Sequence, residues 1–104
     1  MSAQDQIIDA VMALTLQADA IRTHPLMAWI VMHDEAIWPG AFVARLVTDA
    51  ATPYVLLCDT LAGLRDQLPP GLMRTDHQPA DSPEIMEVWF PSDSDRARVS
   101  LAPP

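Results

Sequence analysis

The sequence predicts an α+β domain: an antiparallel sheet of four or five strands with two helices packed on it. Two stretches carry apolar residues at helical spacing, and several short runs are either apolar throughout or alternate with a period of two. Prolines and glycines separate these stretches. The predicted order is α-β-β-β-α-(β)-β, in which the strand in brackets is optional. Half of the 104 residues are hydrophobic, so the chain can bury a core.

The first predicted helix begins after Ser2 and stops at Thr23, His24 and Pro25. Its apolar residues recur every three or four positions, which is typical of an amphipathic helix. They are Ile7, Val11, Leu14, Ala18 and Ile21, with Ile8 and Met12 widening the stripe. Ser2 and Asp5 have the spacing of a capping box, and Pro25 ends the helix. We expect the stripe to cover the sheet, although its heptad-like steps also fit the seam of a helical dimer.

Three strands are predicted next. Leu26–His33 is apolar at nearly every position, which is typical of a central strand buried on both faces. Ala41–Thr48 alternates, with Arg45 on the same face as two valines and the other apolar residues opposite. Tyr54–Cys58 is a short apolar run, again of the kind buried on both faces. The turn-rich connection 49–53 predicts that the last two strands form an antiparallel hairpin.

The second predicted helix begins at Asp59 or Thr60, since either side chain can cap it. Leu61, Leu64 and Leu68 then lie on one face, and the two prolines that follow end the helix.

The last segments are a brief strand or extended connection over 72–77, a loop over 78–83 and a strand over 84–90. Residues 1–90 therefore form a single α+β domain. Residues 91–104 are poor in apolar side chains and are predicted to be a mobile C-terminal tail.

The charge of the chain restricts its partners. Acidic residues number 14 against 6 arginines, which gives a net charge of −8. Nucleic acid is disfavoured, because binding to phosphates needs clustered positive charge; a basic protein surface is a better partner. The single cysteine, the absence of a signal-peptide pattern and the lack of an apolar run of about 20 residues predict a cytoplasmic chain without a membrane segment.

Four stretches resemble segments of a group of small uncharacterised proteobacterial proteins. They read W-I-V-x-H-D, P-G-x-F-V-A-R, D-T-L-x-x-L-R-x-x-L-P-P-G-L and P-x-I-x-E-V-W, and lie between Trp29 and Trp89. This resemblance implies fold boundaries and no activity. A weaker likeness to HicB-type antitoxins rests on Pro39-Gly40 and Asp59-Thr60-Leu61, although two strands rather than one separate these pieces here. It implies an antitoxin or inhibitor whose acidic surface neutralises a basic partner.

Two groups of side chains were considered for chemistry. Cys58 with His24, His33 or His77 has the residue types of a thiolate-imidazole pair, but a lone cysteine at the end of an apolar strand is typically a small core residue. The possible metal ligands His33, Asp34, Glu35, Asp76 and His77 lack the spacing that brings two ligands together. We therefore predict no catalytic residue, cofactor or metal. Acidic residues near the last strand are expected to be hydrated: Asp76, Asp81, Glu84 and Glu87.

The three tryptophans give the main functional hypothesis. Trp29 belongs to an apolar run and is expected in the core, whereas Trp38 and Pro39 lie at a turn. With Trp89, they are the predicted partner-binding residues, because tryptophan is enriched where proteins touch partners. The sequence thus predicts a small non-catalytic protein that acts through protein-protein contacts, including homodimer formation. A small enzyme or metal-binding protein using Cys58 or His33 is the other alternative.

Overall fold

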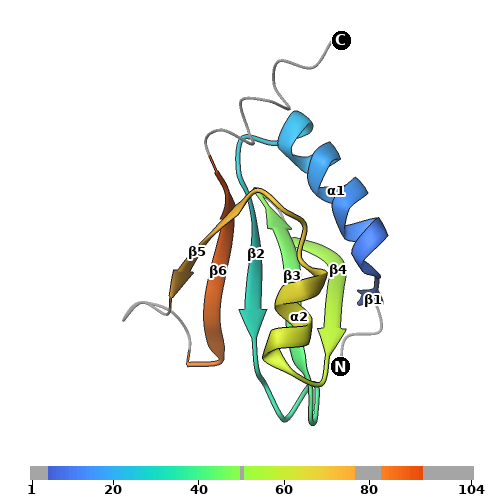
Figure 1. The fold of residues 1–104 in the computed structure, drawn as a ribbon, viewed down its shortest axis with the longest axis vertical. Coiled ribbons are helices and arrows are strands. Elements are labelled where there is room, and N and C mark those ends of the chain that lie inside the picture. Colours follow the sequence, from blue (N-terminus) through green and yellow to red (C-terminus); the bar gives the residue numbers. More distant parts are fainter. Residues whose placement is uncertain (1–4, 50, 77–82, 93–104) are drawn as a thin grey trace.

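A six-stranded mixed sheet carries two helices on one of its faces (Figure 1). The structure is a computed structural model and describes residues 5–49, 51–76 and 83–92. Its elements are β1 (Gln6–Ile7), α1 (Ala10–Thr23), β2 (Met27–Met32), β3 (Phe42–Thr48), β4 (Ala51–Cys58), α2 (Leu61–Gln67), β5 (Leu72–Asp76) and β6 (Ile85–Pro91). The predicted α+β class and the two helices are confirmed. The sheet has more strands than the four or five predicted.

The strands lie in the order β1-β4-β3-β2-β6-β5. All neighbours are antiparallel except β1, which runs parallel to β4 by pairing Gln6 with Tyr54 and Ile7 with Val55. The assignment of Ile7 to the first helix was therefore wrong, because a two-residue strand is too short to show a periodicity of its own. The optional strand is present as β5, at the edge beside β6.

Helix α1 starts later than the capping box predicted. Asp9 is its N-cap, and the Asp9 carboxylate accepts a hydrogen bond from the Met12 backbone N–H at 2.8 Å. Asp5 instead forms an ion pair with Arg45, and Ser2 lies outside the described residues. The predicted end of the helix is confirmed, since α1 ends at Thr23 directly before the Pro25 region.

The buried face of α1 also differs from the predicted stripe. Its buried residues are Ala13, Gln17, Ala20 and Ile21, and of these the predicted stripe contained Ile21; Ile8, which precedes the helix, also packs against the core as predicted. Val11 is 75% exposed and Leu14 is 51% exposed. The buried alanines face the core, and the side-chain carbonyl of Gln17 accepts a hydrogen bond from the Trp29 indole at 2.9 Å. The buried face of α1 was predicted to carry aliphatic side chains. It includes instead the amide of Gln17, which can be buried because it is hydrogen-bonded.

Helix α2 follows the prediction. Thr60 is its N-cap and accepts a hydrogen bond from the Gly63 backbone N–H at 3.0 Å. Leu64 is fully buried, and Leu61 and Leu68 pack against the same core cluster. The cluster joins both helices to one face of the sheet through Trp29 and other strand residues, and Figure 1 shows α2 in front of β3.

Several predicted boundaries shift. The hairpin is confirmed, but β4 already begins at Ala51, so its turn is shorter than the predicted connection 49–53. Strand β6 extends to Pro91, which pairs with Leu72, and so includes a residue that was assigned to the tail. Predictions for residues 77–82 and 93–104 lie outside the described residues. Within the described chain, neither helix is long and apolar enough to cross a membrane.

Candidate functional site

The face of the sheet opposite the helices is apolar, and we call it the open face. Strand alternation and register assign its residues. They are Ile7, Ala28, Ile30, Met32, Val43, Val47, Val55, Leu57, Met73, Val88 and Phe90. Within the described strands, Arg45 and Thr75 are its polar side chains. The alternation of Val43, Arg45 and Val47 confirms the face that the sequence predicted for this strand.

The open face has a buried centre and an exposed apolar rim. Ala28, Val43 and Val55 are at most 5% exposed, yet they do not belong to the core cluster that contains the helices. Five of the eight exposed large hydrophobics in the described chain surround this centre: Ile7, Leu26, Ile37, Met73 and Phe90. An apolar sheet face normally packs against a second layer. In the described chain, both helices lie on the other side.

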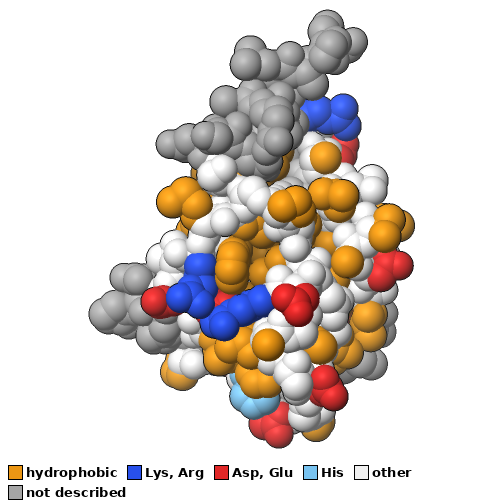
Figure 2. Space-filling model, viewed as in Figure 1, with side chains coloured by type: hydrophobic (Ala, Val, Ile, Leu, Met, Phe, Trp, Pro, Cys, Tyr) orange, Lys and Arg blue, Asp and Glu red, His pale blue; other side chains and the backbone are white. Residues whose placement is uncertain are grey.

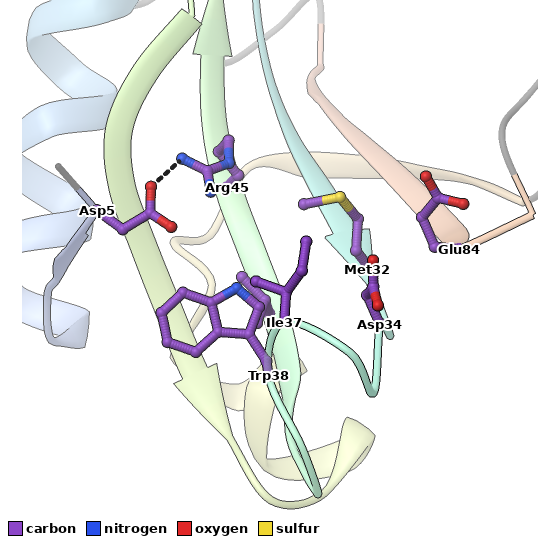
Figure 3. Close-up of a pocket in the computed structure, with 8 residues that line it drawn as sticks. Asp5, Met32, Asp34, Ile37, Trp38, Arg45 and Glu84 are labelled. Atoms are coloured by element: carbon purple, nitrogen blue, oxygen red, sulfur yellow. Dashed lines mark hydrogen bonds and ion pairs between the residues drawn. The ribbon is translucent and has the colours of Figure 1, made fainter. Parts of the chain in front are cut away.

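A hollow of about 280 Å³ lies at the end of the open face where β2 leads into the 33–41 loop (Figure 3). Trp38 and Ile37 extend from this loop beneath Arg45, and Met32 and Val43 supply the strand wall. The carboxylates of Asp34 and Glu84 lie on the side away from Trp38. The hollow therefore combines an aromatic ring and aliphatic side chains with acidic groups at its rim.

Backbone hydrogen bonds hold the loop that carries Trp38. The Asp34 carbonyl accepts from the Trp38 N–H at 2.8 Å, and the Asp34 carboxylate accepts from the Ala36 N–H at 3.0 Å. Glu35 accepts from the Gly40 N–H at 2.7 Å. Gly40 has a φ of +71°, a backbone conformation that glycine adopts without strain. These hydrogen bonds hold the backbone that carries the half-buried Trp38.

Arg45 is neutralised within the chain. Its guanidinium donates to the Asp5 carboxylate at 3.0 Å and to the Thr52 carbonyl at 3.1 Å. The Asp5 side chain is only 7% exposed and that of Arg45 is 24% exposed. The charged side chain on the open face therefore carries its own counter-ion, and the face has no net charge at its centre.

A second hollow, of about 270 Å³, lies at the opposite end of β2. Its wall is almost entirely apolar and includes Leu26, Ala28, Ile30, Val47, Val88 and Phe90. The two hollows are therefore joined by the apolar surface of the central strands, and the open face forms one continuous region.

The helix side of the sheet holds a compact ionic cluster. Figure 2 shows positive and negative side chains next to one another across α2 and β5. Glu87, on β6, is 4% exposed and accepts two hydrogen bonds from the Arg65 guanidinium, the one to Oε1 at 3.2 Å. The Trp89 indole donates to the same Oε1 at 3.0 Å, and Arg74 lies 3.6 Å from Oε2.

The Glu87 prediction was therefore wrong: this carboxylate is buried and not hydrated, because β6 lies inside the sheet between β2 and β5. Burial opposes its ionisation and alone would raise its pKa. Hydrogen bonds from Arg65 and Trp89, with the charges of Arg65 and Arg74, outweigh burial and lower the pKa of Glu87 below its ordinary value. The hydrogen bond to Glu87 likewise raises the pKa of Arg65.

Within the described residues, Cys58, His24 and His33 have hydrogen-bond partners other than one another, and His77 lies outside the described residues. Cys58 is half-buried, and its sulfur lies 3.8 Å from an Asp59 carboxylate oxygen and 4.0 Å from the Thr60 hydroxyl. The imidazole of His33 lies 3.0 Å from the Ala41 carbonyl through Nδ1 and stacks on Phe42. Among the described residues, no three histidine, cysteine or acidic side chains are arranged to hold a metal.

The predicted partner-binding residues lie on two different faces. Trp38 and Pro39 are at the end of the open face, whereas Trp89 lies beside Trp29 on the helix side and donates to Glu87. They do not form one patch. The open face was not predicted as a site from the sequence. The runs Leu26–His33 and Tyr54–Cys58, which are apolar on both faces, did indicate that the sheet has two apolar faces.

No known protein family, curated protein or solved structure matches this chain.

Proposed function

We propose that this protein is a non-catalytic binding domain whose protein partner packs on the open face. The observation that carries the proposal is the one-sided arrangement of the sheet. Both described helices cover one face, while the other is apolar from Leu57 on β4 to Met73 on β5. A sheet face that is apolar over this width and carries exposed large hydrophobic side chains around its rim is typical of a protein interaction site.

The dimensions of the face favour a protein over a small ligand. Each hollow is at or below the lower end of the range of about 300–1,000 Å³ that is usual for ligand pockets. They lie at the two ends of β2, so a partner that fills both must also cover the strands between them. A second layer of protein does this, as in other sheets that pack face to face.

Trp38 gives the face a fixed aromatic anchor. Aromatic side chains at interfaces often supply a large share of the binding energy, above all when they are already ordered. The hydrogen bonds of the 33–41 loop provide this order. We therefore assign Trp38 and Ile37 to one end of the contact and Leu26 and Phe90 to the other. Trp89 is left out, because it faces the helices.

A pair of identical substitutions tests the proposal. Met73 on the open face is 61% exposed, and Met12 on α1 is 47% exposed. The immobilised full chain would be used to capture proteins from a cell extract, with quantification by mass spectrometry. We expect Met73→Gln to reduce capture of the specific partner by roughly tenfold or more, because glutamine places a polar group in an apolar contact. Met12→Gln should leave capture unchanged. Equal capture by all three chains would contradict the proposal.

The acidic rim supports a second candidate, an inhibitor of a basic protein. Asp34 and Glu84 lie beside the Trp38 hollow, and the chain carries a net charge of −8. In that case, Glu84→Gln should weaken capture, and capture should fall steeply as salt is raised. A salt-independent interaction would leave the apolar contact as the function.

A further inference from the structure

We infer that the partner on the open face is a second copy of this chain, so that two sheets pack face to face about a two-fold axis. The inference rests on the proposed function and names the partner of that same face. A two-fold dimer needs a surface that is complementary to itself. An apolar face with a neutral centre meets this requirement, since each copy presents the same chemistry to the other.

Charge is the first argument for a second copy. Two chains that each carry −8 repel one another, so they can only associate through a region that is free of net charge. The open face is such a region, because its charged side chain, Arg45, is paired with Asp5 at 3.0 Å. A basic partner would instead be recognised by carboxylates across the contact, and those of Asp34 and Glu84 lie only at one end.

Area is the second argument. Five strands, β4 to β5, lie side by side at about 4.8 Å spacing, so the face is about 24 Å wide. Seven-residue strands such as β3 and β6 are about 23 Å long. The flat area is therefore on the order of 550 Å². Because Ala28, Val43 and Val55 are already buried, the area that a second copy would cover comes from the half-buried strand residues and the exposed rim. A standard interface buries about 800 Å² on each partner, so a dimer needs the whole face with its rim, and neither hollow alone suffices.

The exposed side of α1 is the rival surface for self-association. Its apolar residues, Val11, Met12 and Leu14, occupy only the first half of the helix. The second half exposes Asp19 and Arg22, which lie 3.6 Å apart as an ion pair. At about 1.5 Å of rise per residue, the apolar part is only about 6 Å long. It is too small to hold two acidic chains together, and it serves as the control surface.

Sedimentation equilibrium of the full chain tests the inference. We expect a species of twice the 11.4 kDa chain mass, in equilibrium with the monomer in the micromolar range. Met73→Gln and Phe90→Ser should each raise the Kd by roughly tenfold or more, and Met12→Gln should change it less than about twofold. Raising the salt concentration should lower the Kd, because salt screens the repulsion between the two acidic chains. Met73 and Phe90 are exposed, so an unchanged Tm will verify that the variants fold.

Three results would overturn the inference. One is a monomer at every concentration up to about a millimolar, which lies at the weak limit of specific association. Another is a dimer that Met12→Gln weakens and the open-face variants do not. The third is a Kd that rises with salt, which would place ion pairs in the contact. A strict monomer that still captures another protein in a Met73-dependent manner would refute the second copy and leave the proposed function standing.

Discussion

At the scale of single residues, Glu87 links α2, β5 and β6 through one buried carboxylate. Its pKa is lowered in the folded chain, so ionised Glu87 stabilises the fold fully at pH values above its ordinary, unfolded pKa. This contribution disappears as the pH falls through the lower folded pKa, because the proton then binds to both states. The cluster therefore supports the fold at neutral pH and weakens in acid.

Glu87→Gln tests this contribution. The amide keeps the shape of the side chain but removes the carboxylate to which Arg65 donates, while Arg74 keeps its ion pair with Asp76. We expect Glu87→Gln to lower the free energy of unfolding by about 1–3 kcal/mol at pH 7. The loss is smaller than for a fully buried ion pair, because Arg65 is partly exposed. The difference from wild type should be smaller at pH 3 than at pH 7, because the stabilisation by ionised Glu87 is lost as the pH falls toward its lowered pKa. Urea denaturation at both pH values measures it.

The control for this prediction is Glu84→Gln, the same substitution at a neighbouring carboxylate that has no ion pair within the described residues. It should change stability by less than about 0.5 kcal/mol. If Glu87→Gln shows the same loss at pH 3 as at pH 7, the carboxylate charge does not contribute and the cluster acts only through packing.

Buried polar residues mark the limit of sequence reasoning at this scale. The burial of Trp29 and the face of Arg45 followed from apolar runs and alternation. Glu87 and Gln17 were missed, because a polar residue in a periodic pattern normally faces water. Their burial depends on partners distant in sequence: Arg65 for Glu87 and Trp29 for Gln17. No local pattern contains that information.

At the scale of elements, the two helices show why one could be predicted and the other only in part. Helix α2 carries its cap at Thr60 and its stop at Pro69 within the sequence, and a single leucine face faces the core. Helix α1 has apolar residues on more than one side. Its buried side consists largely of alanines and of Gln17, which accepts a hydrogen bond from Trp29, and hydrophobic periodicity does not measure these contributions.

Leucine truncations compare the two helices directly. Leu64 is 0% exposed in α2, so Leu64→Ala should cost about 2–5 kcal/mol of unfolding free energy. Leu14 is 51% exposed in α1, and Leu14→Ala should cost less than about 1 kcal/mol, since little apolar area returns to water. Chemical denaturation of both variants measures the difference. A loss at Leu14 as large as that at Leu64 would mean that α1 packs through its predicted stripe after all.

Gly63 illustrates a constraint within α2. Alanine normally favours a helix over glycine by about 1 kcal/mol. Here a Cβ on residue 63 would lie 2.5 Å from the Cys58 sulfur and 2.8 Å from the Thr60 hydroxyl that caps the helix. We therefore expect Gly63→Ala to destabilise the protein by about 1–3 kcal/mol, as overpacking does. Thermal unfolding measures the sign.

A substitution at Cys58 provides the control for the expected clash between a Cβ on residue 63 and the Cys58 sulfur. Cys58→Ala removes the sulfur, so the double variant with Gly63→Ala should lose less stability than the two single losses added together. Simple additivity, or a gain in stability from Gly63→Ala alone, would show that the sulfur does not oppose the methyl group.

At the scale of the whole molecule, the strands could be predicted from the sequence better than the layers that cover the sheet. Leu26–His33 and Tyr54–Cys58 were predicted to be buried on both faces. The structure makes them central strands, but its described helices cover only one face. No sequence pattern in the described chain predicts a second layer that would cover the open face. The difference between the two-sided apolar pattern and the one-sided helix layer is the physical basis of the proposed partner.

Oxidation of methionine by dilute peroxide tests most directly whether the open face becomes covered. Met73 and Met12 are exposed by 61% and 47% in the single chain, on the open face and on α1 respectively. Mass spectrometry follows sulfoxide formation at both sites in one sample, in dilute and concentrated chain and in chain bound to a captured protein. We predict that Met73 oxidation slows several-fold relative to Met12 in the concentrated or bound chain. A constant ratio of the two rates under all three conditions would contradict the account.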